Sequence, residues 1–405
     1  MKFKTWILVA VLLAAVAVAA AQTQRAIPSD LSNHPLSAAE KGGMDETGPY
    51  EVVPDHFKPP FPAGWTWGPV AGIHADSPDR IYVYSRGMLP VLKQNVTGDG
   101  LPARNATEAN NANSELGPSL RREHVLTVYD RNGNPVADWK HLDAMHPEGS
   151  SVHALKVDPR DPDKHLWLLD TRLNQILKVT TDGKVVMRIG PDTVPGRFVA
   201  QFGEEASTTA LAWAATARAA ELAGKRVQAD SILQNMAFLP NGDFFAVESS
   251  RVVKFSKDGQ QLMAFGKRGT APGEINAAHS IAIDAQGRIY VGERSRIQVF
   301  DQSGRSLDIW PNIRFGAGFI AIDRNNHLWV ADGEIHRIAG FDLDGRLLSV
   351  WGVTGLNPGQ LYGVSAFDVD SEGNLYMAEH YGGRVQMFRP KKNADRKRLI
   401  APLLQ

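Results

Sequence analysis

The chain has 405 residues, 43% of them hydrophobic, with 44 Lys+Arg balanced by 44 Asp+Glu, and it contains no cysteine. The balanced charge provides no overall field that would attract nucleic acid or an anionic membrane. A chain without cysteine excludes thiolate catalysis, cysteine-bound metal and disulfides.

The first 21 residues have the layout of a secretory signal peptide. Lys2 and Lys4 precede an apolar run from Trp6 to Ala20, and the small alanines before Gln22 suit cleavage. An uncleaved N-terminal anchor is the alternative, although the run is short and poorly flanked for a membrane span. The sequence therefore predicts an exported protein, periplasmic or secreted, with no membrane span after cleavage.

A unit of four short strands recurs with a period of roughly 40 residues. It is clearest at 275–304, INAAHSIAIDAQGRIYVGERSRIQVFDQSG, where alternating apolar runs are separated by turns that contain glycine. The other copies start from VAGIHADS at 70–77, HALKVD at 153–158, NMAFLP at 235–240, FIAID at 319–323 and SAFDVD at 365–370. Six copies predict an all-β, six-bladed β-propeller, whose blades bury their faces against one another. A β-sandwich with accidental similarity is the alternative.

The repeats also predict how the chain is divided. The expected segments are a signal peptide at 1–21, an N-terminal extension at 22–47, the propeller at 48–390, and a C-terminal tail at 391–405. Two insertions interrupt the propeller: a long loop near 93–122, and a segment near 191–230 with an alanine-rich amphipathic helix. That helix either covers a blade or forms a lid over the channel. The last copy has three strands, so we expect a segment around Tyr50–Val53 to supply the fourth and close the ring.

The first strand of each blade lines the channel in which propellers bind ligands. In five copies this strand ends at an aspartate, and the residue five positions before it should lie at the same level in every blade. These residues are Ala71, His153, Gln234, His279, Gly318 and Ser365. Neutral imidazole binds zinc and other transition metals. The two histidines therefore predict either a channel metal site or two hydrogen-bonded channel histidines.

The blades resemble NHL repeats, and their order is similar to that of the bacterial relatives of peptidyl-α-hydroxyglycine α-amidating lyase. The resemblance covers about residues 48–390 and includes SVHALKVD and PGEINAAHSIAIDAQGRIYVGERSRIQVF. In that family three first-strand histidines bind zinc, calcium lies deeper in the channel, and a tyrosine is the proposed base. The resemblance thus implies a zinc-dependent carbon–nitrogen lyase that releases glyoxylate from a peptidyl hydroxyglycine.

Residue by residue, the resemblance assigns part of that site to this chain. His153 and His279 match two of the zinc ligands. Arg86 and Arg294 match two arginines that line the family's site, which gives them catalytic and ligand-binding roles. The alternative for both arginines is an ion pair with a carboxylate of a neighbouring blade.

Other positions match less well. Ile73 and Leu155 match backbone-carbonyl ligands of calcium, whereas Ser365 stands where the family has its third histidine. The segment at 246–251 lacks the family's tyrosine, and Tyr362 is a candidate to supply a phenol from blade six. The other histidines that could complete a metal site are His74, His146 and His380. Loss of a ligand weakens zinc binding, and loss of the base lowers catalysis by roughly 10²–10⁴-fold.

These departures favour an exported NHL-type propeller that binds a small-molecule or peptide ligand in its channel, without efficient family chemistry. The residues expected to bind that ligand are Arg86, Arg294, Gln234, Ser365 and Tyr362. Because guanidinium groups pair with carboxylates bidentately, we expect a carboxylate-bearing ligand. An active metal-dependent lyase with a rearranged site and a protein-interaction scaffold are the two alternatives.

Overall fold

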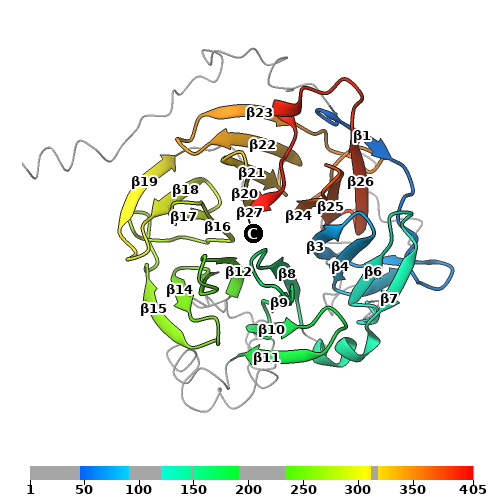
Figure 1. Cartoon of the computed structure of the whole chain (residues 1–405), viewed down its shortest axis with the longest axis horizontal. Coiled ribbons are helices and arrows are strands. Elements are labelled where there is room, and N and C mark those ends of the chain that lie inside the picture. Colours follow the sequence, from blue (N-terminus) through cyan, green and yellow to red (C-terminus); the bar gives the residue numbers. More distant parts are fainter. Residues whose placement is uncertain (1–45, 91–119, 148–149, 191–232, 312–317, 405) are drawn as a thin grey trace, which may run out of the picture.

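The computed structural model describes residues 46–90, 120–147, 150–190, 233–311 and 318–404. Within them, six antiparallel sheets stand around a central axis (Figure 1), which is the predicted six-bladed β-propeller. The predicted signal peptide, the inserted helix and almost all of the long loop lie outside these residues. No helix in the described ranges is long and apolar enough to cross a membrane.

In five blades the strands run from the channel to the rim in chain order. Blades one to three consist of β3 (Val70–Ser77), β4 (Arg80–Ser85), β6 (Leu126–Tyr129) and β7 (Pro135–Asp138); β8 (Val152–Val157), β9 (Leu166–Asp170), β10 (Gln175–Val179) and β11 (Val185–Ile189); and β12 (Leu233–Phe238), β13 (Phe244–Glu248), β14 (Val252–Phe255) and β15 (Gln261–Phe265). Blades four to six consist of β16 (Ser280–Ile283), β17 (Ile289–Gly292), β18 (Arg296–Phe300) and β19 (Ser306–Pro311); β20 (Phe319–Asp323), β21 (His327–Asp332), β22 (Arg337–Asp342) and β23 (Leu347–Trp351); and β24 (Val364–Val369), β25 (Leu375–Glu379), β26 (Arg384–Pro390) and β1 (Tyr50–Val53). Outside the blades lie a two-stranded sheet of β2 (Trp65–Trp67) and β5 (Met88–Pro90), and the 3₁₀ helices η2 (Lys140–Met145) and η4 (Arg396–Arg398).

The ring is closed by the strand that the sequence predicted. β1 pairs antiparallel with β26, from Tyr50 opposite Pro390 to Val53 opposite Met387. Tyr50 is fully buried, and its ring centroid lies 5.9 Å from that of Trp351 in blade five. The first and last parts of the propeller therefore share one blade, which removes an exposed sheet edge.

The aspartate that ends a first strand explains much of the repeat. In blade six, Asp370 Oδ1 accepts hydrogen bonds from the backbone N–H groups of Glu372 and Asn374, at 2.8 and 2.9 Å. Asp370 Oδ2 accepts one from the Tyr376 hydroxyl at 2.8 Å. A single buried carboxylate thus fixes the turn and joins it to the next strand. Asp284 and Asp323 act in the same way in blades four and five.

Replacing Asp370 with alanine should lower the free energy of unfolding by about 2–4 kcal/mol, because it leaves the Tyr376 hydroxyl and turn amides without their acceptor. Urea denaturation would measure the loss. Asp301 is a matched control, since it accepts from the amides of Ser303 and Arg305 in a solvated rim turn. Asp301→Ala should cost clearly less, and equal losses would contradict a special role for the inner turn.

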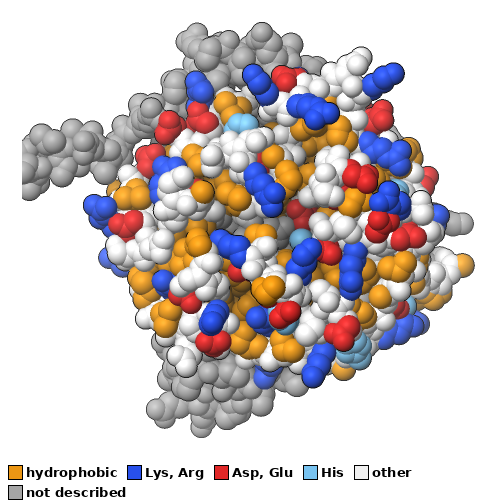
Figure 2. Space-filling model, in the orientation of Figure 1, with side chains coloured by type: hydrophobic (Ala, Val, Ile, Leu, Met, Phe, Trp, Pro, Cys, Tyr) orange, Lys and Arg blue, Asp and Glu red, His pale blue; other side chains and the backbone are white. Residues whose placement is uncertain are grey.

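The C-terminal tail forms a strand that the sequence did not reveal. β27 (Leu403–Leu404) pairs with the channel edge of β20, and the chain ends at the centre of the ring (Figure 1). The Ile400 N–H donates to the Tyr50 hydroxyl at 2.8 Å, and the Ala401 N–H donates to Asp323 Oδ2 at 3.2 Å. The tail therefore lies at the channel mouth on the face that carries the aspartate turns. Acidic and basic side chains are interspersed over this face (Figure 2), in keeping with the balanced charge.

Candidate functional site

The predicted inner ring is present at the opposite end of the channel, and neighbouring blades are hydrogen-bonded through it. His153 on β8 has its Nδ1 2.7 Å from the carbonyl oxygen of Gln234 in blade three. His279, which immediately precedes β16, has its Nδ1 2.5 Å from the carbonyl oxygen of Gly318 in blade five. Because a carbonyl can only accept, each Nδ1 carries the proton, and each Nε2 is left with a lone pair.

The two Nε2 atoms face each other. His153 Nε2 and His279 Nε2 lie 3.1 Å apart, with the ring planes at 62°. A hydrogen bond between them would require one ring to give up its bond to a carbonyl or to become an imidazolium. Two bonds of 2.0–2.1 Å from one tetrahedral metal would hold their nitrogens about 3.3–3.4 Å apart. The pair therefore has the tautomers and nearly the spacing of two ligands of one metal.

Burial and nearby positive charge disfavour the protonated form of both rings. Burial lowers the pKa of His153 well below its ordinary value, and His279 and Arg86 lower it further. Burial also lowers the pKa of His279, and the charges of Arg294 and Arg86 add to this against the opposing Gly318 hydrogen bond. Both imidazoles are therefore neutral at pH 7, the form that binds metal.

Ser365 occupies the third position of the same arrangement. The ring residues of blades two, four and six are His153, His279 and Ser365, and each bonds to a carbonyl of the following blade. For Ser365 the bond runs from Oγ to the Val70 carbonyl at 2.5 Å. The hydroxyl thus replaces the ring-to-carbonyl bond of a histidine but offers no imidazole nitrogen to a metal.

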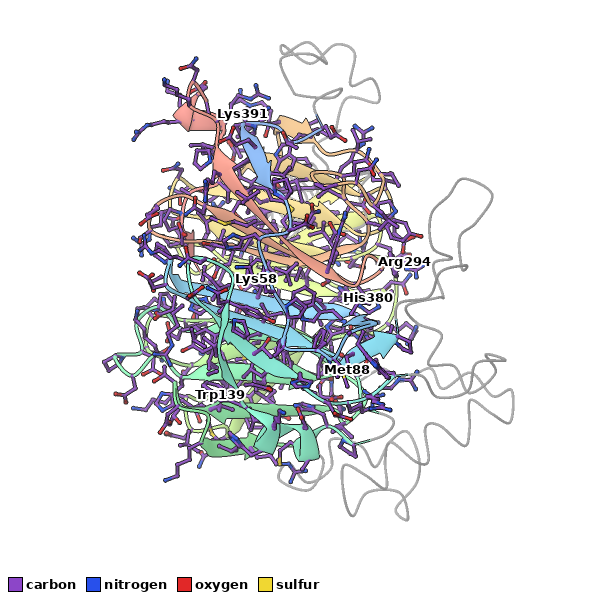
Figure 3. The ribbon with its side chains drawn as sticks, turned by 90° about the vertical axis from the view of Figure 1, so that its right-hand side faces the viewer. Lys58, Met88, Trp139, Arg294, His380 and Lys391 are labelled. Atoms are coloured by element: carbon purple, nitrogen blue, oxygen red, sulfur yellow. The ribbon has the colours of Figure 1, made fainter. Side chains whose placement is uncertain are left out.

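The two predicted arginines lie in the electrostatic environment of the histidine pair. Arg86 Nε donates to the Val152 carbonyl at 3.4 Å, and Arg294 is exposed. His380 follows the second strand of blade six, as the arginines do in blades one and four, and it also lowers the pKa of His153. Arg294 and His380 lie on one face of the propeller, with Lys391 and Trp139 toward the other (Figure 3). Strand-end position is the sequence signal that distinguishes His380 from His74 and His146, the other two candidate histidines.

The other predicted ligand-binding residues have contacts within their own part of the ring. The ring of Tyr362 is buried against His336 and Tyr381, at centroid distances of 4.9 and 5.8 Å. The Gln234 side chain donates to Ser249 Oγ at 3.5 Å, while its backbone carbonyl holds His153.

Two of the three additional histidines are engaged away from the pair. His146 is buried between the Tyr84 hydroxyl and the Asp170 carboxylate, at 3.1 and 3.2 Å. His74 Nδ1 lies 2.7 Å from Asp368 Oδ2, at a level closer to the tail. Of the three, His380 is the one whose charge lowers the pKa of His153.

Ile73 and Leu155, the two predicted carbonyl ligands of calcium, are buried on the neighbouring inner strands β3 and β8. The next residue along β8 is Lys156, and burial lowers the pKa of its ammonium to about 8, against an opposing effect of Asp368. A calcium ion at this level would therefore have a lysine as a neighbour, which is unfavourable for a dication.

One further group could hold a metal within the described ranges. Asp161, Asp163 and His165 bring ligand atoms within 4.8 Å of one another in the turn after β8. His165 Nδ1 already pairs with Asp161 Oδ2 at 2.7 Å. This turn group is the alternative location for a bound metal.

Comparison with known proteins supports the repeat assignment. The chain is 38% identical to human NHL repeat-containing protein 3 over 79 residues, which are 18% of this chain and 23% of that protein. The mouse protein of the same name is 42% identical over 67 residues, 16% of this chain and 19% of that protein. The chain is an NHL-repeat β-propeller. No family model matches it.

A third relative aligns with most of the NHL-repeat propeller at lower identity. Peptidyl-glycine alpha-amidating monooxygenase B from Xenopus laevis is 22% identical over 355 residues, 81% of this chain and 35% of that enzyme. The aligned residues make up about a third of the frog enzyme and less than a quarter of each mammalian relative. Among solved structures, a catalytically inactive virginiamycin B lyase from Staphylococcus aureus aligns over 85% of both chains, with 13% identity and a TM-score of 0.43.

Proposed function

We propose that this NHL-repeat propeller binds a zinc ion between His153 and His279 and uses the site to hold a small molecule or peptide with a carboxylate group. The observation that carries the proposal is the 3.1 Å separation of the two Nε2 atoms, with both Nδ1 atoms bound to carbonyls. Hydrogen bonds from Nδ1 to a backbone carbonyl orient histidines that bind a metal through Nε2. Zinc at this position would supply a Lewis acid toward a ligand oxygen.

We infer zinc rather than calcium for this channel. The nitrogen pair suits zinc, whereas calcium prefers six to eight oxygen ligands. The candidate calcium level instead contains the Lys156 ammonium, which disfavours a dication.

Positive charge around the histidine pair supports an anionic ligand. Arg86 and Arg294 both lower the pKa of His279 through their positive charge, and the same charge would favour a carboxylate held at the metal. N-acetylglycine, a mimic of a peptide C-terminus, should bind the zinc-loaded protein. The double variant Arg86→Ala, Arg294→Ala should weaken this binding roughly tenfold or more while zinc still binds. Calorimetry would measure both, and unchanged affinity for N-acetylglycine would remove the arginines from the proposal.

Metal-assisted lyase chemistry is the second candidate, favoured by the histidine geometry and by the alignment with the frog amidating enzyme. Two features favour slow or absent turnover of a lyase substrate. Ser365 supplies no third imidazole, and Tyr362 packs against His336 and Tyr381.

Glyoxylate release from a peptidyl hydroxyglycine separates the two candidates. We expect the zinc-loaded protein to bind this substrate and to release glyoxylate at least about 10²-fold more slowly than an enzyme with a positioned base. Efficient release that is lost in His279→Ala would establish the lyase instead.

We also propose, from the layout of residues 1–21, that the protein is exported. N-terminal sequencing of the secreted protein would test this, and the expected first residue is Gln22.

A further inference from the structure

A lysine crosses the channel below the histidine pair. Lys156 belongs to β8 in blade two, yet its Nζ lies 4.7 Å from the centroid of the Phe319 ring on β20 in blade five. These two strands lie on opposite sides of the channel (Figure 1). Only 6% of Lys156 is exposed. Its side chain therefore spans the interior of the ring rather than reaching solvent.

Among the described residues, the ammonium has an aromatic partner but no bonded anion. Asp368 acts on it through space. The Asp368 carboxylate is bonded to other groups: Oδ2 to His74 Nδ1 at 2.7 Å and to the Ala75 N–H at 3.0 Å. A buried ammonium without a bonded anion destabilises a fold. This lysine is therefore explained better by a bound ligand than by the needs of folding.

The same level of the channel has small side chains on the other half of the ring. Counting two residues back from each first-strand turn gives His74, Lys156, Ala237, Ala282, Ala321 and Asp368. At these positions blades three to five thus have only methyl side chains, and blade five also contributes the Phe319 ring against the ammonium. Phe319, the ring beneath the ammonium, directly follows Gly318, whose carbonyl holds His279. Adjacent residues of blade five therefore contact the ammonium and the histidine pair.

We propose that Lys156 anchors one carboxylate group of the channel ligand, on the tail side of His153 and His279. A single ammonium neutralises one negative charge, so it suits a monoanionic carboxylate better than a dianionic phosphate. The proposal rests on the channel being the ligand site, and it names the ligand group that reaches deepest. Because the anchoring charge is the Lys156 ammonium, carboxylate binding at this level does not require a metal.

The test uses metal-free full-length protein and three probes: N-acetylglycine, the neutral N-acetylglycinamide and inorganic phosphate. Lys156→Met should weaken N-acetylglycine binding at least roughly tenfold, the loss of a charge-assisted bond, and should raise the melting temperature without ligand. Lys178→Met is the matched control, because Lys178 also lies on blade two with its Nζ 5.2 Å from an aromatic centroid, that of Trp167. It should change neither measurement.

Several results would overturn the assignment. These are no N-acetylglycine binding by the unaltered protein, equal binding of N-acetylglycinamide, preferential binding of phosphate, or unchanged affinity in Lys156→Met. If that variant does not fold, Lys156→Gln replaces it. In the unaltered protein, N-acetylglycine should also slow acetylation of Lys156 relative to Lys178 by peptide mass mapping, and equal rates would contradict the proposal. Zinc binding is measured separately, so failure of the metal site and failure of the lysine anchor are distinguishable.

Discussion

Replacing His153 or His279 with alanine should lower the affinity of the protein for zinc by about 10²-fold or more. Each variant leaves a single imidazole where two Nε2 atoms now lie 3.1 Å apart. Mutation of the groups that hydrogen-bond to metal ligands typically lowers metal affinity by about 10–100-fold. Loss of a ligand itself should lower it at least as much. Because the pKa of both imidazoles is lowered, protons should compete with zinc only below about pH 6.5. Titration of chelator-treated protein with zinc would measure the change.

The matched control is His141→Gln, which removes an exposed histidine that bonds only to the Gly183 carbonyl among the described contacts. It should leave zinc affinity unchanged. His380→Ala reports whether the strand-end histidine contributes, and a loss smaller than that of His153→Ala would mark it as an auxiliary group. Zinc affinity that is the same in His153→Ala, His279→Ala and His141→Gln would mean that the channel pair does not bind the metal.

Removing the closing strand should have the largest effect on stability. A chain that starts at residue 54 lacks β1, so β26 becomes an exposed edge and the interlock of first and last parts is lost. The buried Tyr50 ring and its contact with Trp351 go with it. We expect a loss comparable with the total stability of a typical domain, about 5–15 kcal/mol, and aggregation of the product. Chemical denaturation and light scattering would measure both effects.

A chain that starts at residue 46 keeps β1 and is the control for this truncation. Tyr50→Ala is a milder version, expected to cost about 3–5 kcal/mol by removing a buried aromatic side chain. Tyr50→Phe separates the ring from the hydroxyl, which accepts from the Ile400 N–H. If the chain that starts at residue 54 unfolds cooperatively, with the same denaturation midpoint as the chain that starts at residue 46, the ring does not depend on this strand.

Repetition made the fold predictable, because each blade contains the same strand–turn pattern and the same turn aspartate. It also made the inner ring predictable, since equal spacing from that aspartate places His153, His279 and Ser365 at one level. In the structure each of the three bonds to a carbonyl oxygen of the next blade, and their role in binding stays a prediction. Closure by Tyr50–Val53 followed from counting three strands in the last copy.

Features that depend on one residue or on a very short strand were not predictable from the repeat. β27 has two residues, too few for an alternating pattern, and it is held by pairing with Ile322 and Asp323. Lys156 is one charged residue on an apolar strand, and only the closed ring shows that it reaches Phe319 across the channel. Its signal was its place two residues before Asp158, the same spacing that separates Asp368 from Asp370.

The most direct test is the position of zinc in crystals of the zinc-loaded protein, located by anomalous scattering at the zinc edge. We expect one principal peak in the channel, about 2.0–2.1 Å from both His153 Nε2 and His279 Nε2. A principal peak at the turn of Asp161, Asp163 and His165, or zinc-loaded crystals without a channel peak, would contradict the proposed metal site.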